Sequence, residues 1–135
     1  MRSLSIEIYG DPVPQGSKRA FVVKGKPILT ESAGIRLKTW RQDIVGAARA
    51  ELNGDAPMEG ALRVTVFFYV RRPKKPRNEL PITRPDGDKL ERAVLDALTS
   101  AGVMHDDAQV CSMTWRKRYT TSVPRATIHV AEESA

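Results

Sequence analysis

The sequence has 135 residues, about the size of one domain, and its apolar and charged fractions, 41% and 28%, are those of an ordinary globular protein. Lys and Arg outnumber Asp and Glu by 22 to 16, so the formal charge is +6, which indicates either a polyanionic partner such as nucleic acid or simply a well-solvated surface. The single cysteine excludes an intramolecular disulfide, and no apolar run approaches the roughly 20 residues of a membrane span, so we expect a cytoplasmic protein with no membrane association.

The first half of the chain predicts a strand, a loop, a short hairpin and a long helix. Alternation of Leu4, Ile6 and Ile8 with polar residues indicates a half-buried strand, and the Pro- and Gly-rich stretch "GDPVPQGSKR" follows it as a loop. The stretch "AFVVKGKPIL" predicts a hairpin that turns at residues 24–26. The helix is expected at residues 32–52, with one apolar stripe and an opposite face that carries Arg36, Lys38, Arg41 and Arg49.

The second half predicts one strong strand, a long basic loop, a second helix and two closing strands. Residues 61–71 alternate most clearly, and the loop "RPKKPRNELPITRPDGD" leads to a helix at residues 89–101 that stops at Gly102. The stretches "QVCSMTWRKRYT" and "RATIHVAEE" are predicted to pair as antiparallel strands across "TSVP". We therefore expect one α+β domain spanning residues 1–135, with a single mixed or antiparallel sheet of about five strands and two main helices packed on it.

The segment "RPDGDKLERAVLDALTSAGVMHDDAQV", residues 84–110, gathers most of the acidic residues that bear on function. Each aspartate has an ordinary structural explanation. Asp88 precedes Glu91 by three residues, as in a capping box, and Asp96 can pair with Arg92 one turn before it. Asp106 and Asp107 suit a turn before a strand. The remaining carboxylate, Asp86, lies just before the helix.

A functional interpretation needs these carboxylates to meet in space. The predicted helix has an apolar stripe on one side, and its polar side starts at the Asp86/Asp88 end. If the chain returns antiparallel to this helix, the following strand can bring Asp107 back to the same end. Two such charges 4 Å apart repel by roughly 4 kcal/mol at an effective dielectric of 20, so convergence requires a cation or a large rise in pKa. Carboxylates suit hard ions such as Mg²⁺ or Mn²⁺, and an acidic centre in basic surroundings is typical of a metal-dependent nuclease.

The same residues resemble a known family. The segment "PDGDKLERAVLDALTSAGVMHDDAQV" is similar to the signature of RusA-type Holliday junction resolvases, P-D-x-D-N-L-x-K-x-x-x-D-A-L followed by D-D-x-Q-V, and "GDPVPQGSKRAF" resembles the family's first loop. The resemblance implies that Asp86, Asp88 and Asp107 are catalytic carboxylates that bind Mg²⁺, with Mn²⁺ as a possible substitute and Asp106 beside them. Arg92 stands where the family has lysine; it keeps the charge but cannot titrate as a base. Lys89 stands where the family has asparagine.

The resemblance also implies a biological activity. It predicts an Mg²⁺-dependent endonuclease that resolves Holliday junctions by paired phosphodiester hydrolysis in DNA recombination and repair, works as a homodimer on branched DNA, and needs no small-molecule cofactor. Such a protein is expected in bacteria, phages or prophages and at the nucleoid. The alternatives are a nuclease for other branched or duplex DNA and a non-catalytic nucleic-acid-binding module. The residues expected to bind DNA are Lys18, Arg19, Arg72, Lys74, Lys75, Arg77 and Lys89.

Three further features give weaker signals. Phe67 and Tyr69 face away from the apolar side of their strand, which a covered sheet face or a dimer contact explains better than base stacking. His105 adjoins the two aspartates and is expected to be a turn residue, with proton transfer as the functional alternative. Cys111 is expected to be buried within its strand.

Overall fold

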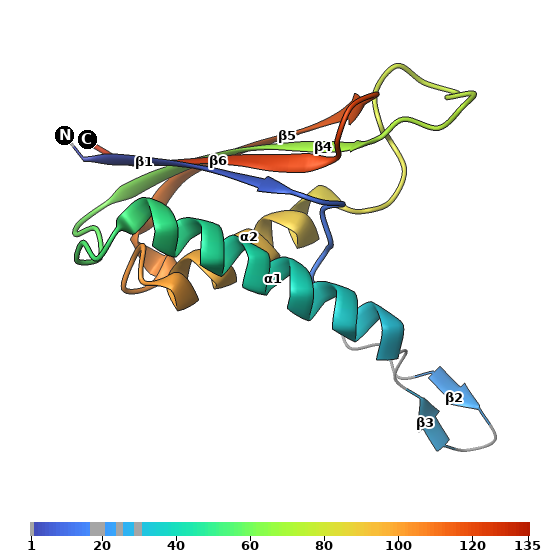
Figure 1. The fold of residues 1–135 in the computed structure, drawn as a ribbon, viewed down its shortest axis with the longest axis horizontal. Helices are drawn as coiled ribbons and strands as arrows, with labels where there is room; N and C mark the ends of the chain where they lie inside the picture. Colours follow the sequence, from blue (N-terminus) through green and yellow to red (C-terminus); the bar gives the residue numbers. More distant parts are fainter. Residues whose placement is uncertain (1, 17–20, 24–25, 29–30) are drawn as a thin grey trace.

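The computed structural model describes residues 2–16, 21–23, 26–28 and 31–135, and it shows a main sheet with two helices packed beneath it (Figure 1). The predicted α+β class is confirmed. None of the described helices is long and apolar enough to cross a membrane. The elements follow in the order β1 (Ser3–Tyr9), β2 (Phe21–Val23), β3 (Lys26–Ile28), α1 (Glu31–Leu52), β4 (Leu62–Arg71), α2 (Gly87–Ala101), the 3-10 turn η1 (Asp107–Gln109), β5 (Val110–Thr120) and β6 (Arg125–Glu132).

The main sheet has four strands in the order β1-β6-β4-β5. β6 pairs antiparallel with both β1 and β4, whereas β5 pairs parallel with β4, so the sheet is mixed as predicted. The count is four rather than about five because the hairpin pairs only with itself. β2 and β3 form a separate two-stranded antiparallel sheet. Of the turn predicted at residues 24–26, residues 24 and 25 lie outside the described residues, and Lys26 begins β3.

The predicted pairing of the last two strands is wrong, because β4 lies between β5 and β6. Burial explains this order. β6 buries Ala126, Ile128 and Val130, which suits an interior strand, whereas no residue of β5 is fully buried. β5 therefore takes the edge of the sheet, and Cys111, predicted to be buried within it, is exposed.

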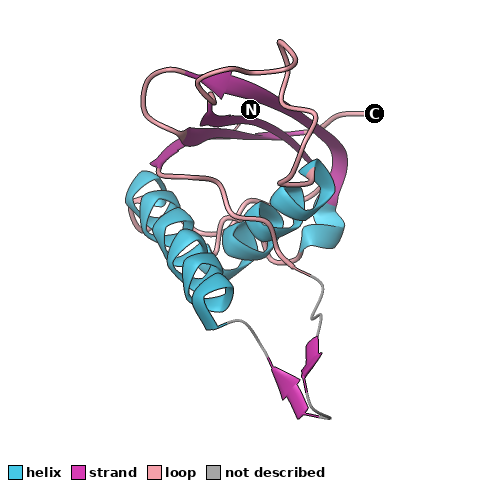
Figure 2. Ribbon diagram, turned by 90° about the vertical axis from the view of Figure 1, so that its right-hand side faces the viewer, coloured by secondary structure: helices cyan, strands magenta, loops and turns pink. Residues whose placement is uncertain are grey.

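Both helices cover the same face of the sheet (Figures 1 and 2). The apolar stripe predicted for α2 is confirmed, since every member of it is buried. On α1, Trp40 and Ile44 are buried in the same core, which β4 completes with Val66 and Phe68. The other face of the sheet is covered by no described helix (Figure 2). Phe67 and Tyr69 project from it, half-buried, with ring centroids 6.4 Å apart.

Helix α2 begins at Gly87, two residues before the predicted start, and ends at Gly102, which adopts the left-handed conformation with a φ of 82°. The predicted stop is confirmed, but the predicted capping box of Asp88 and Glu91 is wrong. Asp86 is the N-cap residue, and its side chain makes no capping hydrogen bond. Asp88 instead lies inside the first turn, where its negative charge interacts favourably with the positive end of the helix dipole.

Candidate functional site

Asp86 and Asp88 are placed by contacts between the start of α2 and strand β5. Gly87, between them, is buried against the indole of Trp115, and a Cβ at this position would lie well inside 3.0 Å of the ring. The Nζ atom of Lys117 donates hydrogen bonds to the carbonyl oxygens of Thr83, at 2.7 Å, and Pro85, at 2.8 Å. Two side chains of an edge strand therefore fix the residues that precede and separate the two carboxylates.

Charge surrounds Asp86 on several sides. The Nζ atom of Lys89 lies 3.8 Å from its Oδ2 atom. Burial lowers the pKa of Lys117, while the nearby carboxylate of Asp86 acts in the opposite direction. Beside Asp88, burial raises the pKa of Glu91, and the negative charge of Asp88 raises it further. The start of α2 therefore combines two lysine side chains near Asp86 with a repulsion between Asp88 and Glu91.

The first loop contacts this end of α2. The backbone N–H of Gln15 donates to the carbonyl oxygen of Lys89, at 3.0 Å. A hollow of about 420 Å³ lies between loop and helix, lined by Pro12, Pro14, Gly16, Arg36, Arg84, Pro85, Asp86 and Lys89. The acidic segment and the Pro-rich loop, distant in sequence, are thus neighbours. Two predicted DNA-binding residues of that loop, Lys18 and Arg19, lie outside the described residues.

Asp106 and Asp107 occupy the turn before β5. Asp106 is the N-cap of η1 and accepts a hydrogen bond from the Ala108 N–H at 2.9 Å, while the Gln109 side chain completes a capping box. The hydrogen bond from Ala108 lowers the pKa of Asp106. A hydrogen bond to Asp106, with smaller contributions that include repulsion from Asp96, raises the pKa of Asp107. Asp106 is thus committed to the turn, and Asp107 is exposed beside it.

Among the carboxylates of α2, Asp96 is the one whose negative charge contributes to the raised pKa of Asp107. Farther along β5, Trp115 lies against Gly87 at the start of α2, and Lys117 binds the backbone just before the helix. Asp96 follows Asp88 by eight residues, about 12 Å along a helix axis. In the described ranges, no three acidic, histidine or cysteine side chains are grouped so that they could hold a metal ion.

The remaining predicted residues are spread over neighbouring surfaces. Arg92 is exposed one turn after Asp88. The pair that it could form with Asp96 is not among the ion pairs of the described residues. His105 is indeed a turn residue, and its Nε2 atom lies 2.7 Å from Oε1 of Glu59. Four predicted DNA-binding residues are exposed in the loop between β4 and α2: Arg72, Lys74, Lys75 and Arg77.

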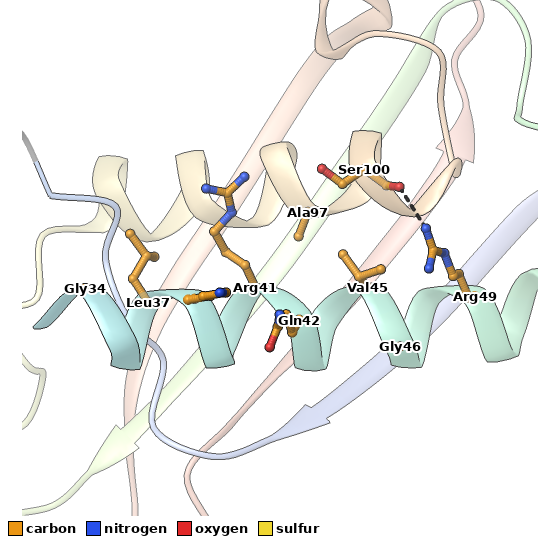
Figure 3. Close-up of a pocket in the computed structure, with 10 residues that line it drawn as sticks. Gly34, Leu37, Arg41, Gln42, Val45, Gly46, Arg49, Ala97 and Ser100 are labelled. Carbon is orange, nitrogen blue, oxygen red and sulfur yellow. Dashed lines mark hydrogen bonds between the residues drawn. The ribbon is translucent and has the colours of Figure 1, made fainter. Parts of the chain in front are cut away.

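A basic groove lies between α1 and α2 (Figure 3). This groove was not predicted from the sequence. It has a volume of about 540 Å³, and its charged lining residues are Lys38, Arg41 and Arg49, with no acidic residue among them. The guanidinium of Arg49 donates to the carbonyl oxygen of Ser100 across the groove, at 3.4 Å. The basic face of α1 was predicted from the sequence. Its position beside α2 was not, because that position depends on how the two helices pack.

These groups offer two chemical functions. The carboxylates of Asp86, Asp88 and Asp107 are oxygen donors of the kind that Mg²⁺ and Mn²⁺ prefer, so the donor set fits a hard divalent ion. Arginine and lysine side chains in the neighbouring loops and grooves can bind phosphate groups without reading base sequence.

Comparison with known proteins adds two findings. The family model described as "Endodeoxyribonuclease RusA" matches residues 10–131, a range that contains both aspartate-bearing segments and the Pro-rich loop. The protein named "Uncharacterized protein YqaN" of Bacillus subtilis (strain 168) is 27% identical over 147 aligned positions that span the full length of both chains.

Proposed function

Because the chain belongs to the RusA endodeoxyribonuclease family, we propose that it is an Mg²⁺-dependent, structure-selective nuclease that resolves four-way DNA junctions by paired phosphodiester hydrolysis. The observation that carries this proposal is the family match over residues 10–131, which includes the whole segment "PDGDKLERAVLDALTSAGVMHDDAQV". We place this activity in DNA recombination and repair at the bacterial nucleoid. The gene is bacterial or is carried by a phage or prophage.

The proposed roles follow the chemistry of each side chain. Asp86, Asp88 and Asp107 would hold Mg²⁺, or Mn²⁺ in its place, and a bound ion would supply activation of water and stabilisation of charge on the phosphate. Asp106 orders the turn through its hydrogen bond from Ala108 and contributes negative charge beside Asp107. Arg92 is exposed, and because a guanidinium group suits phosphate and carboxylate oxygens, its proposed role is to bind a phosphate or orient a carboxylate.

A homodimer is part of the proposal for a geometric reason as well as a symmetric one. Two equivalent strands of a junction call for a two-fold enzyme. Carboxylates that share one Mg²⁺ each lie about 2 Å from it, yet among the described residues of one chain no three acidic, histidine or cysteine side chains are grouped so that they could hold a metal ion. We therefore propose that a two-fold partner brings its own acidic turn to the start of this chain's α2, so that each metal site takes residues from both chains.

The proposed DNA contacts are backbone contacts from the basic loops. Replacing both Lys74 and Lys75 with alanine is expected to weaken junction binding and to reduce the slope of log affinity against log salt by nearly 1 for each phosphate that these lysines neutralise. The salt dependence of binding, measured by fluorescence anisotropy, checks this. An unchanged slope would show that these exposed side chains do not bind phosphate. Arg63, which pairs with Glu133 at 3.5 Å, provides the matched control, and Arg63→Ala should leave the slope unchanged.

The function is tested with a labelled four-way junction and a linear duplex of the same length, each incubated with protein in Mg²⁺ and in EDTA. We expect symmetric nicks near the branch point in Mg²⁺ only, and little cutting of the duplex. Equal cutting of the duplex would show that the protein is a more general nuclease and not a junction-selective one. Binding without any metal-dependent cutting would show that it is a non-catalytic nucleic-acid-binding module.

A further inference from the structure

The side-chain amide of Gln109 makes four hydrogen bonds, all to backbone atoms. Its Oε1 atom accepts from the N–H groups of His105, at 2.7 Å, and Asp106, at 3.1 Å. Its Nε2 atom donates to the carbonyl oxygens of Met58 and Gly60, both at 3.0 Å. An amide has two lone pairs and two N–H bonds, so this side chain uses its full hydrogen-bonding capacity.

These bonds join two segments that are distant in sequence. On one side is the turn at residues 105–109, which carries Asp106 and Asp107; on the other is the segment at residues 58–60, just before β4. The same segments are linked at their base, where the N–H of Met58 donates to the carbonyl oxygen of Val103, at 2.8 Å. Met58 itself is buried in the core, so the turn is tied to a fixed part of the fold.

Asp107 needs such a support because its own side chain is exposed. The direction of an exposed carboxylate depends on the backbone that carries it. Gln109 holds the backbone on both sides of Asp107, since it bonds the N–H of Asp106 directly and is itself the last residue of the turn.

We propose that Gln109 is a positioning residue that holds Asp107 in the orientation needed to bind the metal, an inference that rests on the metal role proposed for Asp107. Few other side chains could replace it. Glutamate would lose both donors and set a negative charge against two carbonyl oxygens, and asparagine is one methylene shorter. Leucine has a similar size but can form none of the four bonds.

The first test measures the turn itself, by amide hydrogen exchange of the full-length protein. In Gln109→Leu the His105 and Asp106 amides should exchange at least tenfold faster than in the wild-type protein, while amides of Val66 and Ile128 in the core stay unchanged. Unchanged exchange at residues 105 and 106 would overturn the proposal. If the leucine variant loses core protection as well, Gln109→Glu provides a second variant: it keeps an acceptor for the two amides but loses both donors to Met58 and Gly60, so the turn is released from that segment and the amides of residues 105 and 106 should still exchange faster than in the wild-type protein.

The second test measures the metal. Mn²⁺ should broaden the amide resonance of Ala108 in the wild-type protein, and Gln109→Leu should need several-fold more Mn²⁺ for the same broadening. Its junction cutting should show a lower kcat with an unchanged Kd for DNA and a higher Mg²⁺ requirement. Equal Mn²⁺ titrations for the two proteins would contradict a positioning role, because a purely structural residue leaves the metal requirement unchanged.

Glu59→Ala provides the matched control. It removes the neighbouring link between the same two segments, the contact of Glu59 with His105 at 2.7 Å, and leaves the four bonds of Gln109 in place. We expect wild-type cutting and metal requirement from it; an effect as large as that of Gln109→Leu would mean that general loosening is responsible. Failure of the proposed function itself has a separate signature, since the wild-type protein would then show no Mn²⁺ broadening near Asp107 while the exchange result still reports on the turn.

Discussion

Asp107→Asn is expected to reduce junction cutting by at least about a hundredfold, a loss of about 2.7 kcal/mol of transition-state stabilisation. Asparagine keeps the size of the side chain but removes the charge that holds a divalent ion. Because Asp107 is exposed, the fold should not change. Junction binding, measured in Ca²⁺ or without metal, should stay the same or become tighter, since a negative charge facing a polyanion has been removed.

Asp43→Asn serves as the control for this variant, because it removes the same charge from an exposed position on α1. It should cut at the wild-type rate. Cutting by Asp107→Asn at a rate close to that of Asp43→Asn would show that Asp107 has no catalytic role.

Mixing two inactive variants tests whether the metal site is shared between chains. If each site combines Asp88 of one chain with Asp107 of the other, a heterodimer of Asp88→Asn and Asp107→Asn chains contains one intact site. Subunit exchange between the two variants should then restore nicking of one strand. Mixtures that stay inactive after exchange would show that each chain supplies its own complete set of carboxylates.

Gly87→Ala is expected to lower the free energy of unfolding by about 1–3 kcal/mol and to reduce cutting. Gly87 does not have a positive φ, so alanine suits its backbone, and the cost comes from the collision of the new methyl group with the Trp115 ring. The indole must move away from the start of α2, which loosens the segment that carries Asp86 and Asp88. Urea denaturation followed by tryptophan fluorescence measures the change in stability.

Gly46→Ala is the matched control for this substitution. Gly46 also lies within a helix, but apart from its chain neighbours and the backbone of its own helix no atom comes within 4 Å of a Cβ built there, so alanine should be neutral or stabilise the protein by up to about 1 kcal/mol. Equal stabilities for the two variants would show that the contact between Gly87 and Trp115 does not constrain the start of α2.

The elements of this fold were largely predictable because local periodicity determines them. The alternation in residues 61–71 and the apolar stripe from Leu90 to Ala101 report directly on which side chains are buried. Gly102 marked the end of α2 for an equally local reason, its left-handed conformation. The strand order was not predictable in this way, since a parallel neighbour for β4 depends on how the whole of β5 crosses the sheet.

The candidate site remains a prediction as a set of residues, which the family resemblance names as Asp86, Asp88, Asp106 and Asp107. What the structure adds is the contacts around these residues, and these contacts were not predictable from the sequence. Lys117, Trp115 and Gln109 make the supporting contacts. These contacts join residues that are distant in sequence, and several involve backbone atoms, which no sequence pattern predicts. The alternation of Trp115 and Lys117 along one strand was the available signal, and it indicated only that they share a face.

The most direct test of the metal site is a crystal structure of the protein soaked in Mn²⁺, with anomalous differences used to locate the ion. The proposed function predicts a peak coordinated by Asp86 or Asp88 together with an Asp107 carboxylate, whether that aspartate comes from the same chain or from a two-fold partner. A dimer in which Mn²⁺ binds away from all three of these carboxylates, or does not bind at a concentration that supports catalysis, would contradict the proposed metal site.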